Sequence, residues 1–187
     1  MRVFVVGTGR CGTCTFFQAC KHISNFTTDH EGKSGQRDIG EWEYPDNHIE
    51  VAAHLAIAMG HLRLKYPEAR WVHLIRNEEN CVRSLVTNSQ APLDYFALHW
   101  LQAFQFNPVR CARVFYHLVN DNIRAMLPRG NYSMTIQLEN IQNAWPEFWS
   151  WIEASGTYSS SLDTWTRKYN STYQRGRDEW IPQGFQL

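Results

Sequence analysis

The residues best suited to chemistry lie close together near the N-terminus, in a stretch that reads VFVVGTGRCGTCT at residues 3–15. Gly7, Gly9 and Gly12 would let the backbone turn tightly and bring several N–H groups toward one anion. The helical pattern that follows would add the unpaired N–H groups and the positive dipole end of a helix start. A strand, a glycine turn and a helix start in this order predict a phosphate-binding loop.

The loop does not match the pattern of proteins that cleave ATP or GTP, which is G-x-x-x-x-G-K-[ST]. Thr13 stands where the phosphate-binding lysine would be, and Cys14 stands where the magnesium-binding hydroxyl would be. Cleavage of ATP or GTP, and with it a P-loop kinase, is therefore disfavoured. A dinucleotide loop, G-x-G-x-x-G, also fits the glycines, and Asp29 is a loose match for its acidic partner. The loop alone leaves this alternative open.

The five cysteines show no spacing typical of a disulfide framework, which predicts free thiols in a reducing compartment. Cys11 and Cys14 form one C-x-x-C pair. This pair lacks the second ligand pair of a zinc site, so we expect no metal. A redox pair would fit a strand-to-helix turn, but the flanking glycines and hydroxyl residues favour a phosphate loop.

A second candidate group lies at residues 74–84, which read LIRNEENCVRS. Arg76 directly follows the strand-like run WVHLI, and Ser84 comes eight residues later, two turns into the expected helix. The guanidinium fork of an arginine suits two parallel hydrogen bonds to a phosphate. The two side chains could therefore face one phosphate group.

The two groups together resemble the sulfotransferase superfamily that uses 3′-phosphoadenylyl sulfate (PAPS) as its sulfuryl donor. The first motif of that family, P-K-S-G-T-T or G-R-S-G-T-T, is similar to GTGRCGTCT here. The second, an Arg, a helix start and a Ser, is similar to RNEENCVRS. WVHLIR, YPEAR and MTIQLENI also resemble family elements, so the resemblance covers about residues 3–155. It implies sulfuryl transfer to a hydroxyl or amine of a small-molecule or carbohydrate acceptor, with PAP as product and no metal.

The resemblance also implies roles for individual residues. Arg10 stands at the position that contacts the bridging and sulfuryl oxygens, and Arg76 and Ser84 stand at the positions that bind the 3′-phosphate. Cys11 and Cys14 depart from the family pattern of small or hydroxyl residues, and a thiol is a weaker donor than a hydroxyl. The implied donor-binding set is Gly9, Arg10, Cys11, Gly12, Thr13, Cys14, Thr15, Arg76 and Ser84, with Arg175 in a short basic tail segment.

A general base is expected because an acceptor hydroxyl is a weak nucleophile. In the family this base is a His or Glu at or beyond the end of the second strand. Glu31 is the favoured match here and His30 follows closely, with a solvated loop pair as the alternative. His54 and His61 are weaker candidates, and His73, inside a buried-type strand, is expected to be a core histidine.

The elements that must position these residues alternate between strands and helices. This predicts an α/β fold with a mainly parallel sheet flanked by helices, a P-loop NTPase-like three-layer sandwich. Such sheets bind ligands at the carboxyl ends of their strands, where the glycine loop lies. Asn77 and Asn107 are expected helix caps, the second ahead of Pro108. We expect strands at 3–6, 26–29, 71–75 and 132–136, helices at 49–66, at 145–154 and after both caps, a loop at 32–47, a helix start at Pro92, and core aromatic residues Phe96, Trp100 and Phe104.

The composition limits the number of domains, the kinds of partner and the location that we expect. The 187 residues are 43% hydrophobic, which suits one domain over residues 1–187, with a lid or an irregular tail at 158–187. Eighteen Lys and Arg balance eighteen Asp and Glu, so a global attraction to nucleic acid is not expected. No apolar run approaches about 20 residues, so we expect no membrane span and a cytoplasmic protein. The oligomeric state stays open, as does the alternative of a non-catalytic nucleotide- or anion-binding protein.

Overall fold

A parallel sheet forms the centre of the structure, a computed structural model that describes residues 1–33, 38–88 and 107–166. In these ranges the sheet has five strands in the order β2-β3-β1-β4-β5, and every neighbouring pair is parallel. The strands are β1 (Arg2–Val6), β2 (Thr27–His30), β3 (His48–Val51), β4 (Arg70–Ile75) and β5 (Ser133–Gln137). β1 therefore lies in the middle of the sheet, and the loop that follows it lies at the carboxyl edge.

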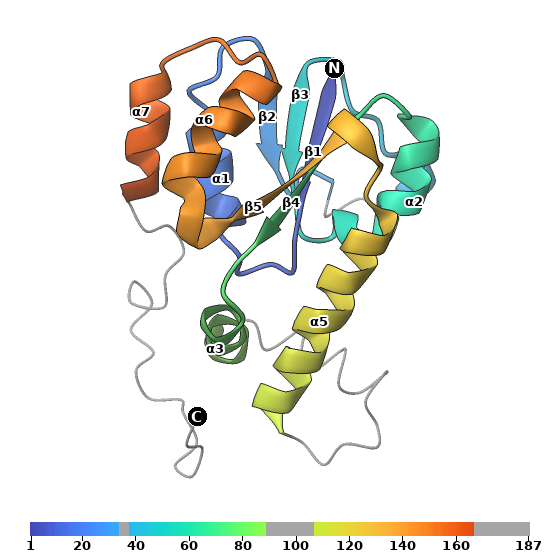
Figure 1. The fold of residues 1–187 in the computed structure, drawn as a ribbon. Coiled ribbons are helices and arrows are strands. Elements are labelled where there is room, and N and C mark those ends of the chain that lie inside the picture. Colours follow the sequence, from blue (N-terminus) through green and yellow to red (C-terminus); the bar gives the residue numbers. More distant parts are fainter. Residues whose placement is uncertain (34–37, 89–106, 167–187) are drawn as a thin grey trace.

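Helices cover both faces of this sheet, which gives three layers (Figure 1). One face is covered by α1, α6 and α7, and the other by α2 and α5, while α3 follows the carboxyl end of β4. The helices are α1 (Thr13–Cys20), α2 (Leu55–Lys65), α3 (Glu78–Asn88), α5 (Pro108–Met126), α6 (Ile141–Trp151) and α7 (Tyr158–Asp163). This arrangement confirms the predicted α/β fold with a parallel sheet flanked by helices.

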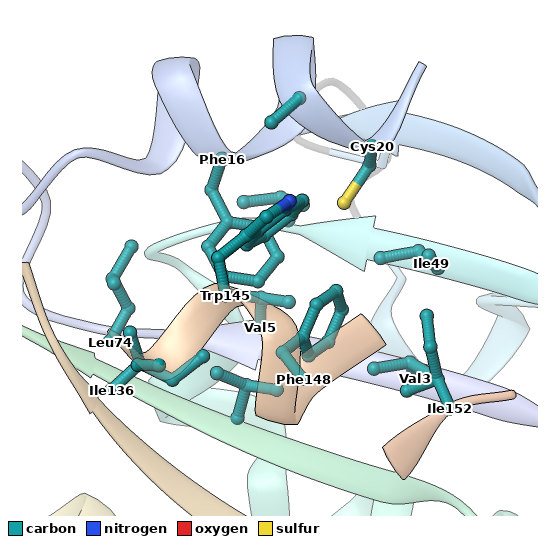
Figure 2. Packing of buried hydrophobic residues seen from close by; sticks show 14 of the residues in the cluster. Val3, Val5, Phe16, Cys20, Ile49, Leu74, Ile136, Trp145, Phe148 and Ile152 are labelled. Atoms are coloured by element: carbon teal, nitrogen blue, oxygen red, sulfur yellow. The ribbon is translucent and has the colours of Figure 1, made fainter. Parts of the chain in front are cut away.

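The face under α1 and α6 carries an aromatic core (Figure 2). Phe16 of α1 packs edge-on against Trp145 and Phe148 of α6, with ring centroids 5.2 and 5.0 Å apart. These rings share one buried cluster with Val3 and Val5 of β1. Burying side chains of this size contributes about 1.5–3 kcal/mol each, so the core fixes α1 against β1 and holds the start of α1 in place.

The opposite face packs under α2, α5 and residues 38–47. Phe4 of β1 contacts the rings of Tyr44 and Trp71, at centroid distances of 5.1 and 4.8 Å. Ile123 of α5 is fully buried in the same cluster. Because side chains alternate along a strand, β1 buries apolar residues on both faces, as a central parallel strand does.

Residues 49–66, predicted as one helix, form a strand and a helix instead. His48–Val51 is β3, which lies between β1 and β2 and is buried along its whole length, and α2 begins only at Leu55. A short apolar run does not distinguish a buried strand from a buried helix by its periodicity. Ile49 and Val51 are β-branched, and their place in the middle of the sheet decides in favour of the strand.

The other predicted elements lie closer to their expected positions. β1, β2, β4 and β5 lie within about one residue of the predicted bounds. Asn107 caps α5, since its side chain accepts a hydrogen bond from the N–H of Arg110 at 3.0 Å. α6 begins at Ile141, earlier than predicted, and contains Pro146. Pro92, Phe96, Trp100 and Phe104 lie outside the described residues.

Residues 158–166, which lie in the predicted tail, form α7 and the short turn η4 (Thr164–Thr166). Trp165 packs edge-on against Phe16 of α1, with ring centroids 5.8 Å apart. Oγ of Ser161 donates to the carbonyl oxygen of Ala19 at 2.8 Å. This segment therefore belongs to the packed structure around α1.

Candidate functional site

The loop between β1 and α1 has a tightly turned backbone that favours glycine at several positions. Gly7 lies against β4, where a Cβ would sit 2.5 Å from the carbonyl oxygen of Leu74. Gly9, Arg10 and Gly12 have φ angles of 73°, 54° and 100°, in the left-handed region. These residues turn the chain sharply from β1 into α1.

The start of α1 offers backbone N–H groups to an anion. Gly12 is the N-cap and makes no side-chain cap hydrogen bond, and the first turn holds no acidic residue. The N–H groups of the first turn have no partner within the helix, and the helix dipole places positive charge there. Thr13 is buried, whereas Cys14 and Thr15 are partly exposed. These features suit a phosphate at a helix N-terminus.

Two hydrogen bonds join this loop to the second predicted group. Nε of Arg10 donates to Oγ of Ser84 on α3 at 3.1 Å, and Nη1 of Arg76 donates to the carbonyl oxygen of Arg10 at 3.1 Å. The hydroxyl of Tyr116 on α5 donates to the carbonyl oxygen of Arg76 at 2.8 Å. The structure thus brings together three predicted donor-binding residues that are far apart in the sequence.

The start of α3 is held by its own cap and by α5. Oδ1 of Asn77 accepts a hydrogen bond from the N–H of Asn80 at 3.2 Å, as predicted. Arg113 of α5 forms ion pairs with Glu78 and Glu79, each at 2.7 Å. These side chains are partly or largely exposed, so the pairs contribute little stability. Their effect is to orient the first turn of α3, and Ser84 with it.

Cys11 faces the protein interior. Its side chain is fully buried, and Sγ lies 2.6 Å from the place that a Cβ at Gly7 would take. Burial, with a smaller contribution from the neighbouring Cys81, raises the pKa of Cys11 to about 12. Sγ of Cys81 lies 3.3 Å from Oγ1 of Thr8. The Cys11 side chain therefore holds the loop against the core, and only its backbone is available to a ligand.

The two predicted base residues lie at the carboxyl end of β2. His30 is half-buried, and its Nε2 lies 3.7 Å from Sγ of Cys14. The hydrogen bond with Cys14 raises the pKa of His30 above its ordinary value, against the opposing effect of burial. Glu31 is exposed and has a φ of 57°. The two groups thus differ in surroundings, and His30 is engaged with the first turn of α1.

His54, given less weight from the sequence, has the surroundings expected of a base. It lies in the turn between β3 and α2, and its Nε2 is buried without a hydrogen-bond partner among the described residues. Burial lowers the pKa of His54, so the neutral ring predominates at pH 7. The preceding Ala53 approaches the loop, with its Cβ 3.6 Å from the place that a Cβ at Gly9 would take. The imidazole ring of His54 packs edge-on against Trp42, with ring centroids 5.2 Å apart.

The remaining sequence candidates lie elsewhere. His61 is exposed on α2. His73 is fully buried in β4 and shares a 2.8 Å hydrogen bond with Oδ1 of Asn120, as expected of a core histidine. Arg175 lies outside the described residues.

Within the described ranges, no group of three or more His, Cys, Asp or Glu could hold a metal ion. In the same ranges, no helix has the length and apolarity that crossing a membrane requires.

No family model matches the sequence, and no curated protein matches it. Solved structures do match. A sulfotransferase domain from the curacin biosynthetic pathway has a TM-score of 0.64 at 11% identity, over 89% of this chain and 78% of that one. A sulfotransferase from Alicyclobacillus acidocaldarius has a TM-score of 0.55 at 13% identity, over 82% and 81% of the two chains. Mouse sulfotransferase SULT7A1, in complex with PAP, has a TM-score of 0.52 at 10% identity, over 87% of this chain and 61% of that one.

These likenesses agree with the resemblance seen in the two sequence motifs at residues 7–15 and 76–84. The strand order, the glycine loop after the central strand and the Arg and Ser after β4 form one arrangement. The chain therefore has the fold of the sulfotransferases.

Proposed function

We propose that this protein is a sulfotransferase that moves a sulfuryl group from PAPS to a hydroxyl or amine of a small-molecule or carbohydrate acceptor. The observation that carries the proposal is the hydrogen-bonded link between Arg10 in the loop and Ser84 on α3, with Arg76 against the loop backbone. PAPS has a 5′-phosphosulfate and a 3′-phosphate, and we assign the first to the start of α1 with Arg10 and the second to Arg76 with Ser84. The mouse neighbour, solved with PAP, supports this choice of donor.

The proposed reaction is an in-line displacement at sulfur. The acceptor oxygen or nitrogen bonds to the sulfur, the bond from sulfur to the bridging phosphate oxygen breaks, and PAP leaves with the bonding electrons. The N–H groups at the start of α1 would hold the 5′-phosphate. Arg76 and Ser84 would hold the 3′-phosphate, and Arg10 would offset negative charge on the moving oxygens. By analogy with phosphoryl transfer, alignment and charge neutralisation supply most of the catalysis.

The proton of the acceptor must go to a base, and we assign this role to His54. Its neutral ring can accept a proton at pH 7, because burial lowers its pKa and Nε2 has no described partner. His30, the second sequence candidate, has its Nε2 already engaged with Sγ of Cys14 at 3.7 Å, so we give it less weight as the base. Glu31, the first, is exposed and water-solvated, so it remains the alternative.

Calorimetric titration with PAP and with AMP tests the donor site. We expect PAP to bind more tightly than AMP, because only PAP carries the 3′-phosphate. Arg76→Ala should weaken PAP binding by about 10- to 100-fold, the loss of a charged hydrogen bond, and leave AMP binding almost unchanged. Arg83→Ala, which removes an exposed arginine on α3, is the matched control and should change neither.

Two outcomes separate the proposal from its alternative. If millimolar PAP gives no heat of binding and no rise in melting temperature, the proposal is wrong. If PAP binds but labelled PAPS yields no product with phenols, sugars, amines or lipid headgroups, the chain is a non-catalytic nucleotide-binding protein with this fold.

A further inference from the structure

Cys14 differs from the other cysteines in its exposure. It is partly exposed in the first turn of α1, where the helix has no acidic residue. The other four thiols are buried: Cys11, Cys20, Cys81 and Cys111. The thiol of Cys14 is therefore more accessible to a reagent in solution than the other four thiols.

His30 is held beside this thiol by two contacts. Its Nε2 lies 3.7 Å from Sγ of Cys14, and its ring packs against Phe17, with centroids 5.6 Å apart. The pKa of His30 is raised, first by the hydrogen bond with Cys14, and further by the nearby carboxylates of Glu31 and Glu50, against the effect of burial. The contact with Cys14 therefore makes the charged form of the His30 ring more favourable than in an isolated histidine.

A thiol between an imidazolium and a helix N-terminus is stabilised as the thiolate, which is its nucleophilic form. Both stabilising groups are present at Cys14, and they come from different elements: the helix end from α1 and the ring from β2. The dyad is distinct from the C-x-x-C pair read in the sequence, because the Cys11 side chain faces the core instead.

We propose that Cys14, activated by His30, is a modification site for low-molecular-weight disulfides, and that its mixed disulfide blocks the phosphate-binding start of α1. The Cys14 thiolate attacks one sulfur of the incoming disulfide, whose S–S bond breaks as a new S–S bond forms to Cys14. The other half leaves as a thiolate and takes up a proton from water. Excess thiol reverses the step. The blocking effect rests on the proposed function of the loop, whereas the reactivity of the dyad does not.

The reactivity is tested on the reduced full chain without nucleotide. Oxidised glutathione should add one glutathionyl group, located by peptide mass spectrometry at Cys14. Limiting iodoacetamide should alkylate the same residue in one fast phase at pH 7, well ahead of the buried thiols. Cys14→Ser should abolish both. Modification spread over several cysteines, or none at Cys14, overturns the proposal.

The rate at which Cys14 is alkylated tests the role of His30. His30→Gln keeps a polar side chain but cannot carry the charge, and it should slow alkylation of Cys14 by about tenfold. His61→Gln, an exposed histidine on α2, is the control and should leave the rate unchanged. Equal rates in the wild type and His30→Gln would show that the contact does not activate the thiol.

Protection by PAP tests the blocking effect. Saturating PAP should protect Cys14 from glutathione disulfide, and the glutathionylated chain should lose PAP binding in calorimetry. If PAP binds but neither protects nor is displaced, the blocking effect is wrong while the donor site stands. If PAP does not bind at all, the proposed function fails, and the alkylation rates still decide whether Cys14 is activated.

Discussion

Among the glycines of the loop between β1 and α1, Gly7 has the least room for an added side chain. An added Cβ would meet the carbonyl oxygen of Leu74 at 2.5 Å and Sγ of Cys11 at 2.6 Å, so strand and loop would have to separate. We expect Gly7→Ala to lower the free energy of unfolding by about 1–3 kcal/mol, measured by urea unfolding. Gly60→Ala is the control, because an added Cβ there meets only the flexible end of Met126. An equal effect of both changes would contradict the predicted contact.

Replacement of His54 separates catalysis from donor binding. His54→Gln should lower kcat by about 100-fold or more while PAP binding stays within about twofold, because a base acts on the acceptor and not on the donor. Glu31→Gln is the comparison, since it removes the alternative base in the same way. A larger loss of kcat in Glu31→Gln would assign the role to Glu31 instead.

The sequence could predict that Arg10, Arg76 and Ser84 lie close together better than it could predict the position of His54. Arg10, Arg76 and Ser84 lie in motifs with defined spacing, and the structure brings them into contact. The sequence pattern predicts a helix over residues 49–66, which includes His54, so its position in the turn between β3 and α2 could not be predicted. The contact between Cys14 of α1 and His30 of β2 joins two elements, and the spacing of residues within one element does not predict such a contact.

At the scale of elements, β3 marks the limit of what pattern alone could predict. β1, β2, β4 and β5 were found from short apolar or β-branched runs bounded by turn residues, and the helix caps from Asn at the right places. β3 is continuous with the apolar pattern of α2, and only its pairing with both β1 and β2 identifies it. The sheet supplies this information, because pairing partners lie far away in the sequence.

The contact between β4 and α5 predicts a pH dependence of stability. His73 is fully buried; its Nε2 pairs with Asn120, and its Nδ1 has no partner among the described residues. Burial lowers the pKa of His73, since a second proton on Nδ1 would be charged and unpaired. The unfolded chain therefore takes up a proton at a higher pH than the folded one. Stability is full above the ordinary histidine value and is lost as pH falls toward the lowered folded value.

Urea unfolding between pH 7 and pH 5 measures this effect. The wild type should lose up to about 1.4 kcal/mol of unfolding free energy per pH unit through His73. His73→Gln keeps a donor for Asn120 but cannot titrate, so the difference between the two proteins should shrink as pH falls. A difference that stays constant over this range would rule out a contribution from His73.

At the scale of the whole molecule, α7 and η4 complete the packing around α1. Oγ of Ser161 donates to the carbonyl oxygen of Ala19 at 2.8 Å and accepts from Nε1 of Trp145 at 3.2 Å, in full burial. Ser161→Ala would remove the hydrogen-bond partner of Nε1 of Trp145, while the carbonyl oxygen of Ala19 keeps its hydrogen bond from the N–H of His22. We expect a cost of about 1–3 kcal/mol, measured by urea unfolding. Ser159→Ala, exposed on the same helix, should cost less than about 0.5 kcal/mol. Equal costs would show that this link does not stabilise the fold.

The same packing has a consequence for the order in which the protein forms on the ribosome. α1 is synthesised well before the segment that covers it, because Ser161, which contacts Ala19, follows that residue by 142 positions, and Trp165 packs against Phe16. An antiparallel bridge between Ile23 and Gly156 likewise joins the region after α1 to the region before α7. α7 and η4 can cover α1 only after they have left the ribosome, so this side of α1 lacks its final contacts until then. The packing of the helix behind the glycine loop is thus completed by a segment that is made much later.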